Sequence, residues 1–264
     1  MIMKLSLSNI AFKPDRNHEI FTYMQQKGFE GLEIAPGLLF GASPYNDLVI
    51  AKRITDEIKM RYMLDIISMQ SIWFGRTESI FSDDDNRKTL LQLTKQAIDL
   101  ADTISCRTIV FGCPKNRNIR DESDLDIAYH FFEVIGNYAK EHDVVFCIEP
   151  NPTIYGTNFL TTTRQALDFV GQLNNDGIAL NLDLGTIIAN SEAIELSTSD
   201  LDLVGHVHIS EPMLVPPVKR DEHQKLKDLL QQYRYNRYIS LEMASNENAD
   251  DIYDAAEYMF EVFR

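Results

Sequence analysis

Four metal-binding residue types stand at the ends of four consecutive apolar runs in the second half of the sequence. They are Glu149, Asp183, His208 and Glu242. If each run is a strand of one parallel sheet, the four side chains reach the same edge and converge. Three carboxylates that lie so close repel one another and raise one another's pKa, and a divalent cation removes that repulsion. These residues therefore predict a metal site.

The ligand types indicate which ions would fit. Three carboxylates and one imidazole suit Mn²⁺, Mg²⁺ or Co²⁺, with Zn²⁺ also acceptable, and disfavour ions that prefer thiolates. Four protein ligands around one octahedral ion leave two coordination positions, enough for two adjacent substrate oxygens. Any one of these residues alone is more often a helix cap, a salt bridge or a core histidine. Their shared position at four run ends favours one divalent metal ion as cofactor.

Short apolar runs alternate with amphipathic helical patterns along the whole chain, and these elements must position the site. The predicted strands are Lys4–Ile10, Gly31–Ile34, Tyr62–Gln70, Thr108–Gly112, Val144–Glu149, Ile178–Asp183, Val204–Ile209 and Tyr238–Glu242. The predicted helices include Asn46–Met60, Arg87–Ile104, Leu125–Glu141, Thr162–Leu173, Asp221–Tyr233 and Ala249–Phe263. Such alternation implies parallel strands with right-handed crossovers. Eight units in 264 residues favour an α/β fold with one domain over 1–264, a (β/α)8 TIM barrel, over a doubly wound open sheet.

Side chains alternate between the two faces of a strand, and the last four strands separate cleanly by this rule. One face carries large apolar residues: Phe146, Ile148, Leu180, Leu182, Val207, Ile209, Ile239 and Leu241. The other carries Cys147, Glu149, Asn181, Asp183, His206, His208, Ser240 and Glu242. The apolar face suits packing under outer helices, so the polar face is expected to line the lumen. Barrel enzymes carry their chemistry at the carboxyl ends of such strands.

Composition narrows the class of protein. The chain is 44% hydrophobic and 25% charged, which is ordinary for a soluble globular protein, but 25 basic and 40 acidic residues give a net charge of −15. Such a surface repels nucleic acid and anionic membranes. No apolar run approaches the roughly 18 residues of a membrane span, and the amino terminus lacks the features of a signal peptide. Three cysteines without a CxxC pair indicate a reducing cytoplasm.

Four segments resemble a known family. CIEPNP, LNLDLG, HVHISEP and SLEM are similar to the four metal-bearing strand ends of the xylose isomerase-like TIM barrels, and their ligands stand 34, 25 and 34 residues apart. GLEIAP, SMQSIWFG and FGCPKNR resemble the second, third and fourth strand ends. The superfamily includes sugar-phosphate isomerases and epimerases, ketose 3-epimerases and, more distantly, endonuclease IV. The resemblance implies a metal-dependent isomerase or epimerase in which Glu149 and Glu242 act as acid and base.

The sequence also departs from that family at substrate-binding positions. Where ketose epimerases have a histidine, a glutamate and an arginine, this chain has Thr186, Tyr155 and Leu214. A simple free ketohexose is therefore not the expected substrate, and a lyase or dehydratase on the same metal site becomes an alternative. Endonuclease IV relatives need further histidines, where this chain offers Gln70, Cys113 and Thr186. That difference and the acidic charge argue against DNA cleavage.

Eight further residues are candidates for contacts with the substrate: Glu33, Gln70, Trp73, Lys115, Arg117, His206, Glu211 and His223. Lys115 and Arg117 could bind a carboxylate or phosphate, or form a solvated loop pair. Trp73 and the neighbouring Phe74 could cover a sugar ring or pack in their loop, and Glu33 could contact substrate or make a structural hydrogen bond. His206 lies one layer below His208 and could be a core residue. His223 could replace the missing arginine or belong to the charged start of a helix.

These observations lead to one expected function and two alternatives. The expected protein is a cytoplasmic, metal-dependent isomerase or epimerase of a sugar or sugar derivative, and the substrate can be anionic because a bound cation offsets the acidic rim. The alternatives are a lyase or dehydratase and a non-catalytic barrel that binds a carbohydrate or a partner. The family resemblance adds a homo-oligomer as a further expectation. Neither nucleic acid nor membrane is an expected partner.

Overall fold

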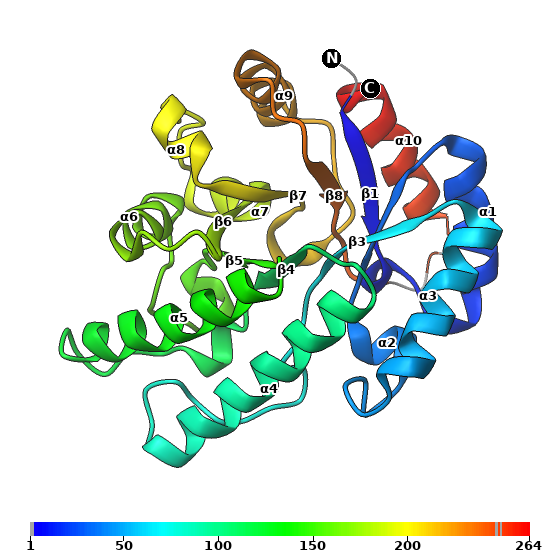
Figure 1. The fold of residues 1–264 in the computed structure, drawn as a ribbon. Helices are drawn as coiled ribbons and strands as arrows, with labels where there is room; N and C mark the ends of the chain where they lie inside the picture. Colours follow the sequence, from blue (N-terminus) through cyan, green and yellow to red (C-terminus); the bar gives the residue numbers. More distant parts are fainter. Residues whose placement is uncertain (1–2, 246–247, 249) are drawn as a thin grey trace.

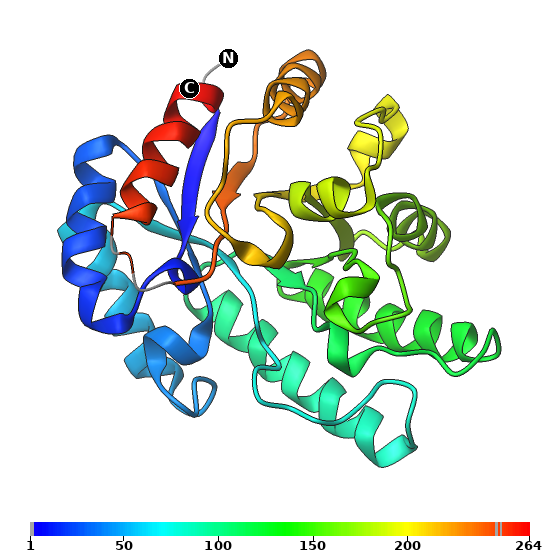
Figure 2. The same ribbon diagram turned by 180° about the vertical axis from the view of Figure 1, so that it is seen from behind.

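Eight parallel strands form a closed barrel with the helices around it (Figures 1 and 2). The computed structural model describes residues 3–245, 248 and 250–264. The strands are β1 (Lys4–Ser8), β2 (Gly31–Ile34), β3 (Asp65–Met69), β4 (Thr108–Phe111), β5 (Val145–Ile148), β6 (Ile178–Asp183), β7 (Val204–Ile209) and β8 (Tyr238–Leu241). Each strand pairs with the next, and β8 pairs with β1, where Ser6 lies opposite Ser240. The predicted (β/α)8 TIM barrel is confirmed.

Helices fill the connections between the strands. They are α1 (Asn17–Lys27), α2 (Pro36–Phe40), α3 (Leu48–Tyr62), α4 (Asp84–Thr103), α5 (Asp124–Glu141), α6 (Thr163–Leu173), α7 (Leu184–Asn190), α8 (Thr198–Asp202), α9 (Asp221–Tyr233) and α10 (Asp251–Phe263). The last helix, α10, runs beside β1, the first strand (Figures 1 and 2). Because β8 pairs with β1, the first and last strands end at the same rim of the barrel.

Helix α4 shows how the local sequence builds one of these elements. The Asp83 side chain accepts a hydrogen bond from the Asn86 backbone N–H at 2.8 Å, and this N-cap satisfies one of the free donors at the helix start. The apolar stripe of the sequence becomes the buried face of the helix, with Leu90, Ala97 and Ile98 fully buried. Amphipathic periodicity therefore fixes which face of α4 covers the barrel.

The two predicted faces of the later strands are confirmed. The apolar set, including Phe146, Leu182 and Val207, joins one hydrophobic cluster with residues of the outer helices. On the other face, small residues pack the lower lumen: a Cβ atom added to Gly205 would lie 2.5 Å from Cys147 Sγ. Above that layer the lumen is polar and leads to the strand ends. The barrel therefore has an apolar outer layer and a polar upper interior.

Several predicted boundaries were wrong by two or three residues. The third strand begins at Asp65 rather than Tyr62, because α3 continues through Tyr62 and ends at Met63, whose φ is 59°. That helix begins at Leu48 rather than Asn46, because Asp47 serves as its N-cap. An apolar residue at a helix end looks like the start of a strand in the sequence, which explains the first error.

Other boundaries changed at element ends. The first strand stops at Ser8, and the chain turns through a short 3-10 helix, Asn9–Ala11. Glu149 and Glu242 directly follow the last residues of β5 and β8. The predicted start of the last helix, residue 249, lies outside the described residues, and α10 begins at Asp251. None of these shifts changes the face to which a site residue belongs.

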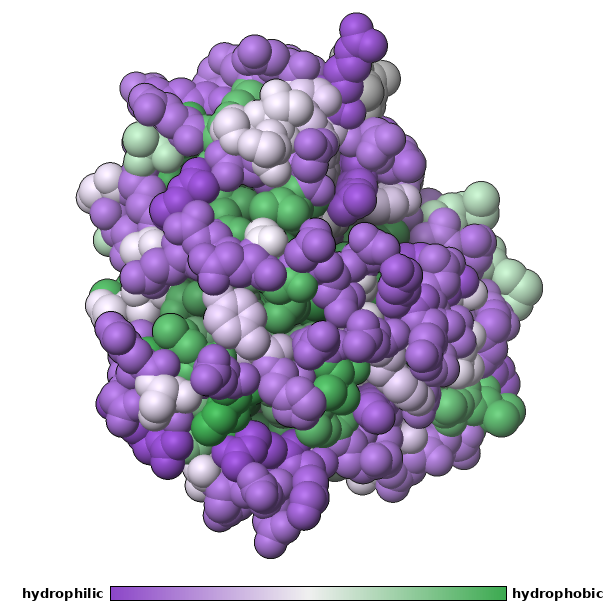
Figure 3. Space-filling model, turned by 60° about the vertical axis from the view of Figure 1, so that its left-hand side comes forward, coloured by the Kyte–Doolittle hydropathy of each residue, from purple (hydrophilic) through white to green (hydrophobic). Residues whose placement is uncertain are grey.

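The surface agrees with the acidic, polar composition. Hydrophilic residues predominate on the face in Figure 3, and hydrophobic ones lie in patches between them. Within the described parts of the chain, no helix is long and apolar enough to cross a membrane. Cys106 and Cys147 are buried, Cys113 is partly buried, and all three are free thiols.

Candidate metal and substrate site

A cavity of about 580 Å³ opens at the carboxyl ends of the strands. Among the residues that line it are Gln70, Lys115, Glu149, Asp183 and Glu242. They come from loops and strand ends far apart in the sequence, and the closed barrel places them around one mouth. A cavity of this size falls in the range typical of small-molecule sites. The rim thus holds both the predicted ligands and room for a substrate.

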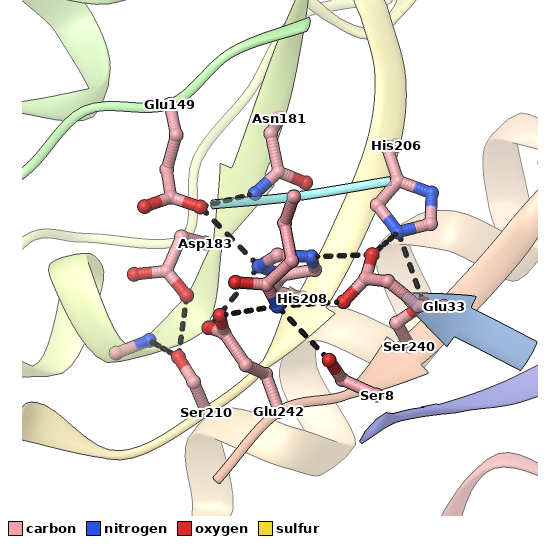
Figure 4. A network of polar contacts seen from close by, with 12 residues as sticks. Ser8, Glu33, Glu149, Asn181, Asp183, His206, His208, Ser210, Ser240 and Glu242 are labelled. Atoms are coloured by element: carbon pink, nitrogen blue, oxygen red, sulfur yellow. Dashed lines mark hydrogen bonds and ion pairs between the residues drawn. The ribbon is translucent and has the colours of Figure 1, made fainter. Parts of the chain in front are cut away.

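Three of the four predicted metal ligands meet in one cluster. His208 Nδ1 lies 3.3 Å from Glu149 Oε2 and 3.2 Å from Glu242 Oε2, and candidate ligand atoms of all three lie within 4.8 Å of one another (Figure 4). That nitrogen is buried and has no hydrogen-bond partner among the described residues. An imidazole nitrogen between two carboxylates is a donor set that fits a divalent cation.

The other nitrogen of the His208 ring, Nε2, contacts the buried carboxylate of Glu33. His208 Nε2 lies 3.0 Å from Glu33 Oε2, and the same oxygen accepts a hydrogen bond from the Ser68 hydroxyl at 2.6 Å (Figure 4). Glu33 is completely buried and does not line the cavity, so the structure shows its hydrogen-bond role and no path to a substrate. A carboxylate behind a metal-binding imidazole fixes both its tautomer and its orientation.

Opposite charges stabilise the buried contact between Glu33 and His208. Burial would raise the pKa of Glu33, but His208 and His206 hold it well below its ordinary value. Burial would lower the pKa of His208, but Glu33, Glu242 and Glu149 raise it well above its ordinary value. The carboxylates therefore favour a positive charge at the ring, which is a proton in the absence of an ion and which a bound divalent cation would replace.

Asp183, the fourth predicted ligand, lies at the cavity but outside this cluster. Its Oδ2 accepts hydrogen bonds from the Thr186 N–H and hydroxyl, both at 2.7 Å, and its Oδ1 accepts one from Ser210. The carboxylate thereby caps α7. Burial, with the charges of Glu149 and Glu242 nearby, raises the pKa of Asp183 to about 7. Its membership in the ligand set remains a prediction.

The two candidate acid/base glutamates have different surroundings. Glu149 accepts hydrogen bonds from two amides, Asn151 Nδ2 at 2.6 Å and Asn181 Nδ2 at 2.9 Å. Glu242 accepts one, from Gln70 Nε2 at 2.8 Å. Burial would raise the pKa of Glu149, but His208, Asn151 and Arg117 lower it. Burial and nearby carboxylates raise the pKa of Glu242. Two carboxyl groups with unequal proton affinity are what paired base and acid roles require.

Trp73 and Phe74, the two aromatic residues predicted to contact a substrate, differ in exposure. Trp73 lines the cavity but is only 2% exposed, because its indole N–H donates to Thr94 Oγ1 at 3.0 Å and its ring packs against Phe111. The next residue, Phe74, also lines the cavity and is 91% exposed. The ring free to lie against a substrate is therefore that of Phe74.

The predicted pair Lys115 and Arg117 also separates. Lys115 is exposed and lines the cavity, whereas Arg117 is completely buried and does not. His206 also lies below the cavity, where its Nε2 contacts Glu33 Oε2 and Ser240 Oγ, both at 3.0 Å (Figure 4). Of these three, only Lys115 can reach a molecule in the cavity.

The strand-seven candidates lie away from the cavity. Glu211 is buried and accepts hydrogen bonds from the Arg220 guanidinium at 2.7 Å and the Val218 N–H at 3.3 Å. His223 is buried in α9, and its Nδ1 lies 2.9 Å from the Tyr258 hydroxyl on α10. Neither residue lines the cavity, so the structure gives both a packing role.

The loops after β5, β7 and β8 are joined at the rim. The Tyr155 hydroxyl accepts a hydrogen bond from the Met213 N–H at 2.8 Å, and Leu214 O accepts one from the Ala244 N–H at 2.8 Å. Met213 and Leu214 have φ angles of 61° and 54°. This is a left-handed backbone conformation that residues other than glycine rarely adopt. Tyr155 and Leu214 both line the cavity.

Sequence reasoning missed the importance of Asn151. Its amide joins Arg117 to Glu149, yet its only signal in the sequence is its place two residues after Glu149 in CIEPNP. Asn181 had a clearer signal, because it shares the lumen face with Asp183. Alternation along strands finds such residues, whereas it does not extend into loops.

Comparison with known proteins gives a consistent family and fold. The family model described as xylose isomerase-like TIM barrel matches residues 21–262. No curated protein matches the chain. Its structure is similar to 3-keto-D-glucoside 4-epimerase from E. coli, with 19% identity, coverage of 98% of this chain and 99% of that one, and a TM-score of 0.77.

Two further structures are similar over nearly their whole length. D-Psicose 3-epimerase from Clostridium cellulolyticum H10, solved with D-tagatose, is 15% identical, with coverage of 99% and 100% and a TM-score of 0.77. The probable 3-DHS dehydratase from Bacillus anthracis is 17% identical, with coverage of 98% and 99% and a TM-score of 0.69. At such low identity these similarities show a common fold.

Proposed function

Since the chain belongs to the xylose isomerase-like TIM barrel family, we propose that it is a divalent-metal-dependent isomerase or epimerase of a sugar or sugar derivative. One observation carries the proposal: the buried Nδ1 of His208 makes ion-pair contacts with both Glu149 and Glu242, two carboxylates that line one cavity. The two carboxylates face the same space, where a substrate would meet both.

The donor set defines what the metal would contribute. Glu149, His208 and Glu242 would hold the ion, with Asp183 as a fourth ligand, and the absence of thiolates favours Mn²⁺, Mg²⁺ or Co²⁺, with Zn²⁺ acceptable. A divalent ion bound there would polarise a substrate carbonyl and stabilise the charge that develops on its oxygen. The protein's own part is to position the substrate and to move its proton.

Glu149 and Glu242 would carry that proton. One takes the proton from the carbon next to the carbonyl, and the other returns a proton to the carbon skeleton. Return to the opposite face of the same carbon gives an epimer, and return to the adjacent carbon gives the aldose–ketose isomer. The side chains are only 12% and 9% exposed, so bulk water has little access to the carboxylates.

The rim favours a substrate with an anionic end. Lys115 is exposed at the cavity, whereas the other cation of the lining, Arg76, is paired with Glu78 through two hydrogen bonds. A carboxylate or phosphate is the natural partner of such a lysine. The sugar class itself comes from the similar epimerases. With free thiols and an acidic surface, a cytoplasmic location is part of the proposal.

Solvent exchange tests this function. Metal-loaded protein is incubated in D₂O with a panel of sugars and sugar acids, and one carbon-bound deuterium is expected in a true substrate, without other change in composition. The Glu149→Gln, Glu242→Gln double variant is the control and should give no exchange. If no compound of the panel that binds the loaded protein exchanges a proton, the proposed function is wrong.

A dehydratase is the second candidate. It is favoured by Tyr155, Thr186 and Leu214, which stand where ketose epimerases have polar contacts, and by the similar fold of the probable 3-DHS dehydratase. The same proton removal followed by loss of a β-hydroxyl would give a product lighter by one water. Mass spectrometry separates the two reactions. Tight binding without exchange or mass change would instead favour a carbohydrate-binding barrel.

A further inference from the structure

Arg117 places a guanidinium group where burial is unfavourable. The side chain is 0% exposed, and burial lowers the pKa of Arg117 to about 10. Two of its nitrogens, Nε and Nη1, have no hydrogen-bond partner in the part of the chain that the structure describes. A buried charge that is poorly hydrogen-bonded contributes little to folding and usually costs free energy. Stability alone gives no reason for an arginine here.

The third nitrogen makes a directed contact toward the cavity floor. Arg117 Nη2 donates to Asn151 Oδ1 at 2.8 Å, and Asn151 Nδ2 donates to Glu149 Oε1 at 2.6 Å. Because a guanidinium can only donate hydrogen bonds, the carbonyl oxygen of the amide must face Arg117. The NH₂ group must then face Glu149. Arg117 therefore determines which way the amide points.

The surrounding backbone confines both groups. A Cβ atom added to Gly112 would lie 2.8 Å from Glu149 Oε1 and 3.2 Å from Asn151 Oδ1, so the backbone already borders both side chains. On the other side, the Arg117 guanidinium lies 5.9 Å from the centre of the Phe111 ring, a cation–π contact. The side chains of Arg117, Asn151 and Glu149 therefore have little freedom to rotate.

We propose that Arg117 is a positioning residue, which fixes Glu149 for metal binding and proton transfer by orienting the amide of Asn151. The inference rests on the proposed function, because Glu149 is its endpoint. Arg117 does not line the cavity, so it would act without touching the substrate. This role differs from the direct contact with a substrate anion that the sequence predicted.

Replacement of Arg117 provides the test. Arg117→Met keeps much of the volume and removes both charge and donors, whereas Arg117→Lys keeps the charge and one donor group. Metal affinity is measured by calorimetry with Mn²⁺, and kcat, KM and Tm are measured on metal-saturated protein. We expect Arg117→Met to lower Mn²⁺ affinity or kcat about 10–100-fold, the range for residues that support metal ligands. KM and Tm should stay near wild type, and Arg117→Lys should recover part of the loss.

Arg120, three residues further along, is the matched control. Its side chain is largely exposed and binds Asp124 at the start of α5, so Arg120→Met should lower Tm and leave kcat unchanged. Wild-type metal affinity and kcat in Arg117→Met would overturn the proposal. So would a fall in Tm with unchanged kcat per folded molecule, which marks a structural role.

A second variant keeps the test decisive if Arg117→Met fails to fold. Asn151→Ala removes the intermediate amide, and the proposal requires the same loss of Mn²⁺ affinity or kcat; wild-type values would overturn it. Failure of the proposed function is recognised separately, because wild-type protein would then bind no divalent ion or exchange no proton. Calorimetry reports on Arg117 even before a substrate is known.

Discussion

His208 meets two different requirements with its two ring nitrogens. Nε2 faces Glu33 at 3.0 Å, which holds the ring from the barrel interior. Nδ1 contacts Glu149 and Glu242, two carboxylates that line the cavity. One buried partner therefore fixes the tautomer that leaves the other nitrogen available as a ligand. If His208 binds a metal ion, its orientation depends on Glu33, a residue that does not line the cavity.

The substitution Glu149→Gln tests whether Glu149 transfers a proton as acid or base. The amide keeps the shape of the side chain but cannot take up a proton, so turnover should fall about 10²–10⁴-fold. Substrate binding should be partly retained, because the cavity walls are unchanged. Steady-state kinetics on protein of known metal content measures both effects. Near-normal turnover would show that Glu149 transfers no proton.

His223 should make the fold sensitive to mild acid. Burial lowers its pKa from the ordinary 6.5 despite the opposing charge of Glu211, and its Nε2 is buried without a partner among the described residues. The unfolded chain therefore takes up this proton at higher pH than the folded one. Its contribution to stability is complete above the unfolded pKa of about 6.5 and is lost as pH falls toward the folded value.

Unfolding in denaturant at pH 7.5 and 5.5 measures this effect. His223→Gln should reduce the slope of the unfolding free energy with pH, by at most about 1.4 kcal/mol per pH unit for one proton. His130→Gln is the control, because His130 is exposed on α5. An identical pH dependence of wild type and His223→Gln would refute the assignment.

Strand β7 illustrates how one element depends on its neighbours. Its Gly205 faces the lower lumen, where an added Cβ would lie 2.5 Å from Cys147 Sγ and 2.8 Å from Ala179 Cβ. Gly205→Ala should therefore overpack this layer and destabilise the fold by about 1–3 kcal/mol. Because β7 also carries His208, metal affinity should fall with stability.

A second glycine provides the comparison. Gly37 lies in α2, and a Cβ added there meets nothing within 4 Å. Gly37→Ala should leave the fold unchanged or stabilise it by about 0.5–1 kcal/mol, since alanine loses less backbone entropy. Thermal unfolding of both variants checks the pair. Equal Tm values for Gly205→Ala and wild type would contradict the close packing.

Elements of regular alternation were predictable from the sequence, whereas loop contacts were not. The lumen face of β5 to β8 followed from the period-two pattern, and it placed Glu149, His208 and Glu242 correctly at one rim. The burial of Arg117 and Trp73 depends on how loops fold over the strand ends, which no periodicity encodes. The hydrogen bonds of Asp183 to Thr186 and Ser210 likewise arise only after β6, α7 and β7 meet.

Part of the net charge of −15 on the whole molecule comes from carboxylates that lie close together at the cavity, namely Glu149, Asp183 and Glu242. The carboxylates at the cavity floor repel one another, so a bound cation should stabilise the folded state. We expect about one divalent ion per chain in purified protein, by elemental analysis. Saturation at 100 times Kd corresponds to about 2.7 kcal/mol, and each kcal/mol raises Tm by about 2–4 °C.

Chelation tests this prediction. EDTA treatment should lower Tm, and added Mn²⁺ should restore it in wild type. Glu149→Gln, Glu242→Gln protein should respond much less, because it retains fewer charged ligands. Equal responses of the two proteins would place the bound ion elsewhere on the acidic surface, and no response in either would contradict the metal site.

The rim contacts among Tyr155, Met213, Leu214 and Ala244 have a consequence for how substrate preference could change during evolution. One hydrogen bond to a side chain and one between backbone groups connect the loops after β5, β7 and β8, and the middle loop holds two successive left-handed residues. A substitution in one of these loops therefore alters the conformation of the next. Variants with new specificity should carry coordinated changes in all three loops, while Glu149, His208 and Glu242 stay constant. Directed libraries for this protein should accordingly randomise the three loops together.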